Sequence, residues 1–243
     1  MDKKFAILGD IHANLDALET VLADARAQGA TDYICVGDVV GYNACPNECC
    51  DRIRALGCVT VQGNHDHYCA FDESLDDFTP LAATVVDWTR RQLSSENADW
   101  LRSLPYTALV KGITVVHATL DMPEHWGYAF EDFDAQSSFS YQNTFVCFHG
   151  HTHVPVVFRL HNGEADHVRP ESIRLEPGRK YFINVGSVGQ PRDSIPDASY
   201  CLYSPATREL VFRRIPYDVA AAQRRVLDAG LPEHLALRLA KGR

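Results

Sequence analysis

The feature that most restricts the fold of this chain is a series of five short apolar runs, each followed by residues of the kind that bind metal ions. The segments concerned are Gly9-Asp10-Ile11-His12, Gly37-Asp38, Gly63-Asn64-His65-Asp66, His117 after Ile113–Val116, and Gly150-His151-Thr152-His153. A lone Asp after a strand is usually a turn former or a helix cap, and a lone His is usually a surface or satisfied core residue. Five such segments in order instead predict one metal site with several ligands, assembled from strand ends.

The first third of the chain alternates between strand and helix patterns. The strand patterns are Phe5–Leu8, Tyr33–Val36 and Cys58–Val61, and the helix patterns between them are Asn14–Gln28 and Pro46–Leu56. This βαβαβ order predicts a parallel sheet with right-handed crossovers. Groups that bind ligands collect beyond the carboxyl ends of the strands in such sheets. Asp10, Asp38 and Asn64 each fall at one of these ends.

The remaining two thirds change from helical to β patterns. Helices are expected at Leu81–Gln92, Asn97–Ser103 and Phe130–Phe139, and a hairpin at Tyr106–Val110 with Ile113–Val116. Further strands are expected at Thr144–Phe148, Val154–Leu160, Ser172–Leu175, Tyr181–Val185, Ser199–Tyr203 and Leu210–Ile215. Val219–Leu227 and Pro232–Leu239 predict a helical hairpin. The fold class expected is α/β (α+β), a four-layer αββα sandwich of two mixed sheets flanked by helices. Residues 1–243 would form one domain, with 216–243 as a C-terminal helical tail.

Charge and composition exclude some classes of partner. The formal net charge of −9 argues against an extended surface for nucleic acid. No apolar run approaches the roughly 20 residues that span a bilayer, so no membrane partner is expected. The apolar run that begins at Phe5 stops at Gly9-Asp10, too early for a signal peptide, and a cytoplasmic protein is therefore expected. The eight cysteines contain no Cys-x-x-Cys pair and are expected to be reduced and mostly buried. A structural zinc at Cys45 and Cys49 lacks two further ligands.

The candidate ligands restrict the metal. They are Asp10, His12, Asp38, Asn64, His117, His151 and His153. A mixed nitrogen and oxygen set without thiolate favours manganese, iron, zinc, nickel or cobalt, and magnesium is a further possibility. Seven ligands are too many for one such ion. Two divalent ions that share a bridging carboxylate, about 3.5 to 4 Å apart, fit the set better.

In these motifs the chain resembles the calcineurin-like metallophosphoesterase superfamily, and is most similar to its small prokaryotic phosphodiesterase branch. The match continues through Gly37-Asp38-Val39-Val40-Gly41, Asn184-Val185-Gly186-Ser187, Val188 to Asp193 and Gly230-Leu231-Pro232. The resemblance therefore covers nearly the whole chain.

The resemblance implies a role for each ligand. One ion would be held by Asp10, His12, Asp38 and His153, and the other by Asp38, Asn64, His117 and His151. Asp38 would bridge the two ions, with manganese the first expectation for the metal. His65 takes the place of the family's catalytic histidine, and Asp66 is expected to support the site from behind the ligands.

One segment departs from the pattern of the protein-phosphatase relatives. Gly41-Tyr42-Asn43 stands where those proteins carry an arginine-bearing segment that grips phosphate, which weakens the protein-phosphatase interpretation. Arg192 is a possible phosphate contact, and a surface pair with Asp193 is the alternative. His149, two residues before His151, could share its face. We otherwise interpret the histidines outside the site as surface or core residues, namely His67, His125, His149, His161, His167 and His234.

The resemblance implies hydrolysis of a phosphate ester, with a phosphodiester as the first expectation. Hydroxide that bridges the metals would attack phosphorus in line, and His65 would assist the leaving group. The alternatives are a phosphomonoesterase or protein phosphatase, a nucleotide pyrophosphatase, and a non-catalytic metal-binding interaction module. The expected substrate is a phosphorylated small molecule or a nucleotide. Trp126, Tyr128 and Phe130 could line a nucleotide pocket or be buried or interface aromatics. The sequence does not define the oligomeric state.

Overall fold

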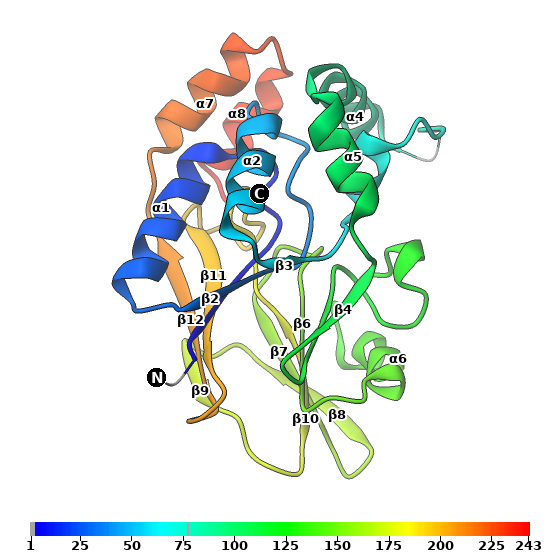
Figure 1. The fold of residues 1–243 in the computed structure, drawn as a ribbon, viewed down its shortest axis with the longest axis vertical. Coiled ribbons are helices and arrows are strands. Elements are labelled where there is room, and N and C mark those ends of the chain that lie inside the picture. The colour runs from blue at the N-terminus through cyan, green and yellow to red at the C-terminus, as the bar shows by residue number, and fades with distance from the viewer. Residues whose placement is uncertain (1–2, 77) are drawn as a thin grey trace.

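Two six-stranded sheets pack face to face in the computed structural model (Figure 1). The model describes residues 3–76 and 78–243; Met1 and Asp2 of the amino-terminal segment and Asp77 of the loop 68–79 lie outside the described residues. The first sheet has the order β3 (Val59–Thr60), β2 (Asp32–Cys35), β1 (Phe5–Leu8), β11 (Ala198–Ser204), β12 (Glu209–Ile215) and β9 (Ser172–Arg174). The second has the order β4 (Thr107–Val110), β5 (Ile113–Val116), β6 (Val146–His149), β10 (Lys180–Asn184), β7 (Val156–His161) and β8 (Glu164–Val168).

Helices cover the outer faces of both sheets. They are α1 (Leu15–Ala27), α2 (Pro46–Leu56), α3 (Asn64–Ala70), α4 (Pro80–Gln92), α5 (Ser95–Ser103), the 3₁₀ turn Pro123–His125, α6 (Asp132–Tyr141), α7 (Val219–Asp228) and α8 (Glu233–Leu239). In Figure 1, α1 and α2 lie against the first sheet, and α6 lies at the far side of the second. Both sheets contain parallel and antiparallel pairs. The predicted α/β class with two mixed sheets and flanking helices is confirmed.

The apolar alternation of the strands fills the space between the sheets. Ile7, Ile34, Phe148 and Ile183 are fully buried there. A second apolar cluster joins α1 and α2 to the first sheet, and a third, with Phe139 at its centre, joins α6 to the second. Removal of apolar area from water contributes about 25 cal/mol of stability per Å². The three clusters therefore stabilise the packing of the sheets on each other and of the helices on the sheets.

Parallel pairing places the polar strand ends at one edge of the sandwich. β1, β2 and β3 run parallel in the first sheet, and β5, β6 and β10 run parallel in the second. The loops after β1, β2, β3, β5 and β6 carry the five segments with residues of the kind that bind metal ions. The predicted convergence of those segments therefore has a topological cause.

One strand and one α-helix were not predicted, and neither was the short 3₁₀ turn Pro123–His125. The strand β8 was missed because Glu164–Val168 is largely polar and lies at a sheet edge. A signal was present, since Asn162-Gly163 is a two-residue turn that pairs His161 with Glu164 in a hairpin. The helix α3 was missed because it has only seven residues and no apolar stripe. It begins at Asn64, so it sets the directions of Asn64 and His65.

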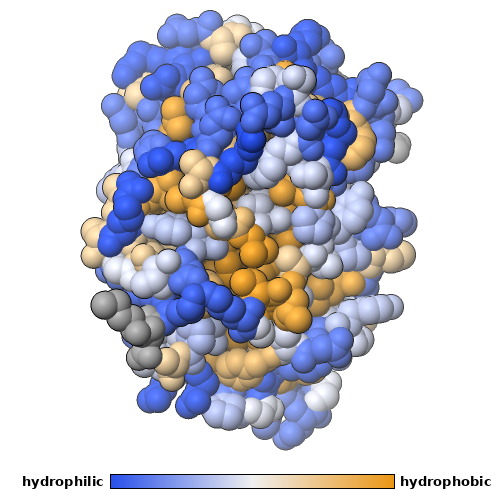
Figure 2. All heavy atoms as spheres, in the orientation of Figure 1, coloured by the Kyte–Doolittle hydropathy of each residue, from blue (hydrophilic) through white to orange (hydrophobic). Residues whose placement is uncertain are grey.

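The C-terminal helical hairpin packs beside α4. Val226 of α7 and Leu235 of α8 are buried against Val85. Arg225 of α7 also forms an ion pair with Asp16, with its Nε 3.0 Å from Oδ2. None of the helices in the described part of the chain is long and apolar enough to cross a membrane. Figure 2, in the orientation of Figure 1, shows apolar side chains gathered mid-face, where β3 and β4 lie, and mostly polar side chains over the helices above.

All eight cysteines are free, and seven of them are buried. Burial raises the pKa of the Cys49 and Cys147 thiols well above the ordinary value, so these groups stay protonated near neutral pH. The predicted reduced, mostly buried thiols are confirmed.

Candidate metal centre

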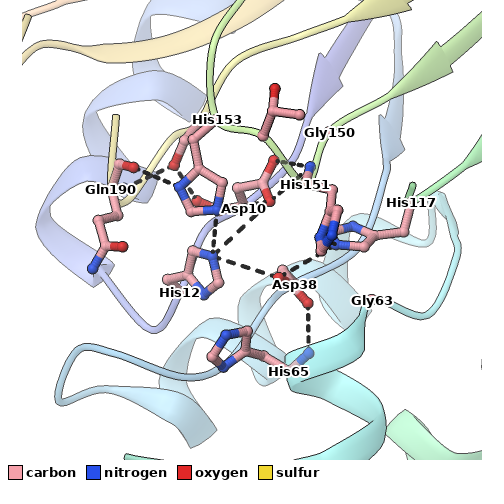
Figure 3. Close-up of polar contacts among 12 residues, drawn as sticks. Asp10, His12, Asp38, Gly63, His65, His117, Gly150, His151, His153 and Gln190 are labelled. Carbon is pink, nitrogen blue, oxygen red and sulfur yellow. Dashed lines mark hydrogen bonds and ion pairs between the residues drawn. The ribbon is translucent and has the colours of Figure 1, made fainter. Parts of the chain in front are cut away.

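Two groups of buried ligand-type side chains meet at the edge of the sandwich where the parallel strands end. One group is Asp10, His12, Asp38 and His153, and the other is Asp38, His117 and His151. Within each group the ligand atoms lie within 4.8 Å of one another. Asp38 belongs to both groups. Figure 3 shows His12, Asp10 and His153 on one side of Asp38, and His117 and His151 on the other.

A single oxygen of the Asp38 carboxylate lies between the two groups. Its Oδ2 is 3.5 Å from Nε2 of His12 and 3.4 Å from Nε2 of His117. Its Oδ1 instead accepts the backbone N–H of His65 at 2.9 Å. This hydrogen bond from the His65 N–H fixes the carboxylate, so that the other oxygen is available to both groups.

The first group contains two imidazole nitrogens that face each other without a proton. Nδ1 of His12 donates to the carbonyl of Val40 at 3.0 Å, and Nδ1 of His153 donates to the carbonyl of Gln190 at 2.6 Å. Burial lowers the pKa of both rings, so they are neutral and their Nε2 atoms carry lone pairs. These two Nε2 atoms are 3.1 Å apart. Two lone pairs at this distance repel each other, and a cation that both nitrogens bind would remove the repulsion.

In the second group, a carbonyl orients the ring of His117 in the same way. Nδ1 of His117 donates to the carbonyl of Val36 at 2.9 Å, which directs Nε2 toward Asp38. Nδ1 of His151 lies 3.2 Å from that Nε2. Carbonyls that accept the distal N–H are the usual partners of metal-binding histidines, because they fix the tautomer and the ring orientation.

Asn64 completes the second group. Its side chain lines the same small pocket as Asp38 and His151. Its Oδ1 is buried and accepts no hydrogen bond from the described residues. A buried acceptor without a partner is costly, so this oxygen fits a cation ligand.

The backbone of the ligand loops is strained. Asp10, His12, Asp38, His151 and His153 all have φ between 49° and 70°, in the left-handed region. Non-glycine residues in that region cost on the order of 1–3 kcal/mol each when the surroundings enforce them. Such strain in five of the seven predicted ligands is typical of a functional site.

The glycines of the motifs allow the loops to approach the carboxylates. A Cβ on Gly63 would lie 2.1 Å from Oδ1 of Asp38, and a Cβ on Gly150 would lie 2.3 Å from Oδ2 of Asp10. The Gly-before-ligand pattern in the sequence is therefore a packing requirement. The N–H of His151, one residue after Gly150, donates to both oxygens of Asp10 at 3.1 Å.

His65 lies beside both groups but joins neither. Its ring makes an edge contact with the ring of His12, with centroids 4.9 Å apart, and lies 4.4 Å from the ring of Tyr42. Burial lowers the pKa of His65 to about 4, so the imidazole is neutral at pH 7. Its Nδ1 is buried and has no hydrogen-bond partner among the described residues.

Asp66 ties the ligand loops together. One carboxylate oxygen accepts the N–H groups of Val39 and Val40 at 2.8 and 3.2 Å, and the other accepts the N–H of Gly63 at 3.1 Å. Asp66 therefore joins the loop of Asp38 to the start of α3. Burial and the neighbouring Asp38 carboxylate raise the pKa of Asp66 to about 7.

Arg192 also lines the pocket. The alternative prediction for Arg192 was a surface ion pair with Asp193. This prediction is wrong, because Asp193 pairs with Arg214 instead. Arg192 donates to Oε1 of Gln190 at 3.1 Å and forms no ion pair with the described residues. Its guanidinium and that of Arg238 lie 5.7 and 5.6 Å from the ring centroid of Tyr42. Burial, and then the charge of Arg192, lowers the pKa of Arg238. These adjacent, incompletely paired cations favour an anion in the pocket.

Sequence reasoning did not identify Tyr42 as a site residue. The signal was the departure of Gly41-Tyr42-Asn43 from the protein-phosphatase pattern. His149 lies outside both groups: its ring stacks on Phe182 with centroids 3.8 Å apart, and burial lowers its pKa to about 3. Tyr128 and Trp126 lie near the pocket, while Phe130 stacks on Tyr128.

The chain is similar to several known proteins. Residues 4–208 match the family model of the calcineurin-like phosphoesterase superfamily domain. The uncharacterized protein MJ0912 of Methanocaldococcus jannaschii is 40% identical over 248 residues, which cover 98% of each chain. The crystal structure of a metallophosphoesterase from Sphaerobacter thermophilus is similar over 100% of both chains, with 38% identity and a TM-score of 0.89. A hypothetical protein, PH1004, from Pyrococcus horikoshii shares the fold with 19% identity and a TM-score of 0.81, over 99% of this chain and 98% of its own.

Metal binding should release protons. Burial opposes protonation of His117, but the Asp38 carboxylate outweighs it and raises the His117 pKa to about 9 in the metal-free protein. A cation that takes Nε2 must displace this proton, so Mn²⁺ binding at pH 7 should release about one proton per chain. The affinity should rise as the pH approaches 9. Isothermal titration calorimetry in buffers of different ionisation enthalpy measures the release, and a heat that does not depend on the buffer would contradict it.

Proposed function

The chain belongs to the calcineurin-like phosphoesterase superfamily and is a hydrolase of phosphate esters, and on that premise we propose that it is a two-metal phosphodiesterase. The observation that carries the proposal is the position of Asp38 Oδ2, within 3.5 Å of the facing nitrogens of His12 and His117. One shared carboxylate oxygen between two ligand groups is the arrangement that a dinuclear centre requires.

Each of the two ligand groups would hold one ion. Asp10, His12, Asp38 and His153 would hold one ion, and Asp38, Asn64, His117 and His151 the other. Neutral imidazoles with carboxylate and amide oxygens suit manganese first, with iron, zinc, nickel, cobalt or magnesium as alternatives. When bound, such ions lower the pKa of a coordinated water and offset the charge of phosphate oxygens.

His65 would act on the leaving oxygen. Because its ring is neutral at pH 7, it would stabilise the negative charge that develops on that oxygen as a hydrogen-bond donor. The hydrogen bond from its backbone N–H to Asp38 holds His65 beside the shared carboxylate. Asp66 would keep Asp38, Asn64 and His65 in register through its three backbone hydrogen bonds.

Two cavities that share lining residues with the pocket support a diester. The pocket at the ligands has a volume of about 40 Å³. Asn64, His65 and His151 also line a cavity of about 320 Å³, and Arg192 also lines another of about 560 Å³. A phosphate held in the pocket would have room for an organic group in each of the two cavities. The unpaired charge of Arg192 favours the runner-up, a phosphomonoesterase, because a monoester carries one more negative charge.

His65→Ala tests the proposed chemistry. With Mn²⁺, the wild-type protein should hydrolyse bis(p-nitrophenyl) phosphate faster than p-nitrophenyl phosphate. The variant should keep its metal content and lose about 10²–10³-fold in kcat, the usual cost of removing one hydrogen-bond donor to a developing oxyanion. Unchanged turnover would remove His65 from the mechanism, and loss of metal would make it a ligand. Absence of metal-dependent hydrolysis in the wild type would instead favour an interaction module.

Arg192→Gln tests the phosphate contact. Loss of a hydrogen bond from a charged donor costs about 1.5–3 kcal/mol, so the inhibition constant of inorganic phosphate should rise about 10- to 100-fold. Arg179→Gln is the matched control, because Arg179 pairs with Glu176, three residues away along the chain. Equal inhibition constants in the two variants would rule out a phosphate contact by Arg192.

A further inference from the structure

The cavity of about 320 Å³ beside the candidate metal centre has a direct connection to it. Asn64, His65 and His151 line both this cavity and the small pocket at the ligands. A phosphate held at the centre would therefore place one of its ester groups in the cavity. The volume lies at the lower end of the range of about 300–1,000 Å³ for small-molecule pockets. It is large enough for one ring system and too small for a folded macromolecule.

The wall of the cavity is aromatic. Five of its lining residues carry phenol, phenyl or indole rings, namely Tyr42, Tyr68, Phe78, Trp126 and Tyr128. Thr79 and Ala82, at the start of α4, complete the lining. No Lys, Arg, Asp or Glu is among the lining residues in the described part of the chain. The group that fits this wall is uncharged and flat.

Core packing accounts for Tyr42, Tyr68 and Phe78, which pack against buried apolar clusters, but not for Trp126 and Tyr128. Tyr128 is 52% exposed, yet its ring lies 4.2 Å from the ring of His151. Trp126 has a left-handed φ of 54°, and its ring makes an edge contact with the ring of His117 at 6.0 Å. Phe78 makes an edge contact with Tyr68 at 4.7 Å. The strained backbone at Trp126 thus keeps its ring beside the metal ligands. A planar group bound in the cavity would cover the exposed aromatic faces.

We infer that the substrate carries a planar aromatic ring, a nucleobase or an aryl group, on the ester group that enters this cavity. The inference rests on the proposed function, because the cavity matters only if phosphate binds at the metal centre. Stacking between the guest and these rings selects the substrate, while the metal centre and Arg192 hold its phosphate.

Two matched pairs of phosphates test the inference, each as an inhibitor of bis(p-nitrophenyl) phosphate hydrolysis by the Mn²⁺-loaded protein. Adenosine 5′-monophosphate and ribose 5-phosphate differ only in the base. Phenyl phosphate and cyclohexyl phosphate differ in planarity at similar size. In at least one pair the aromatic member should inhibit about tenfold better or more, as expected for base–aromatic stacking. The pair that shows the preference identifies nucleobase or aryl as the source of the ring.

Phe78→Ala and Trp126→Ala should each reduce the preference within that pair toward one, without weakening inhibition by the non-aromatic member. Phe133→Ala, in a ring that is 86% exposed on α6, is the matched control and should leave the preference unchanged. Metal content is measured for each variant, since Trp126 contacts His117. Equal inhibition within both pairs would overturn the inference, as would a preference that survives both variants.

Failure of the proposed function gives a different result. If the wild-type protein does not hydrolyse the reporter, binding of the same four compounds to the Mn²⁺-loaded protein is measured by calorimetry. A ring preference that both variants remove would then support the aromatic cavity in a protein without the proposed activity. Absence of that preference would overturn the inference as well.

Discussion

The rest of the site depends on the buried carboxylate of Asp38. Burial opposes its charge, yet the neighbouring histidines hold its pKa well below the ordinary value. Its Oδ2 lies between two groups of imidazoles, and one of these groups contains facing lone pairs. Nitrogen and oxygen atoms with this much unshared electron density are stable in one place only when positive charge lies among them. In the metal-free protein a proton on His117 supplies part of that charge.

The fold supplies this arrangement through strand ends. Parallel pairing of β1 with β2, and of β5 with β6, brings loops that are far apart in the sequence to one edge. The loops after β1, β2 and β6 then accept left-handed backbone at their ligands. The energy for that strain comes from the apolar core between the sheets and from the hydrogen bonds of Asp66. Stability elsewhere in the molecule thus maintains a centre that is unfavourable without its ions.

The sequence was sufficient to select the Asp and His side chains that cluster at this edge, and much of the frame, because both depend on local pattern. Apolar runs that end in glycine and a polar residue define Asp10 and Asp38 together with the strands before them. Features that depend on distant contacts could not be predicted. The pairing of Asp193 with Arg214 joins residues 21 positions apart, and Tyr42 meets Arg238 only because the C-terminal hairpin folds back. The aromatic cavity likewise combines side chains from five separate segments, and the segments of Phe78 and Trp126 carry no motif.

The central claim is that two cations share Asp38. Electron paramagnetic resonance of the protein during titration with Mn²⁺ tests it most directly, because ions that share a carboxylate bridge are magnetically coupled. We expect binding to saturate at two ions per chain with the spectrum of an exchange-coupled pair. Saturation at one ion per chain, or two ions with the spectrum of isolated Mn²⁺, would contradict the account.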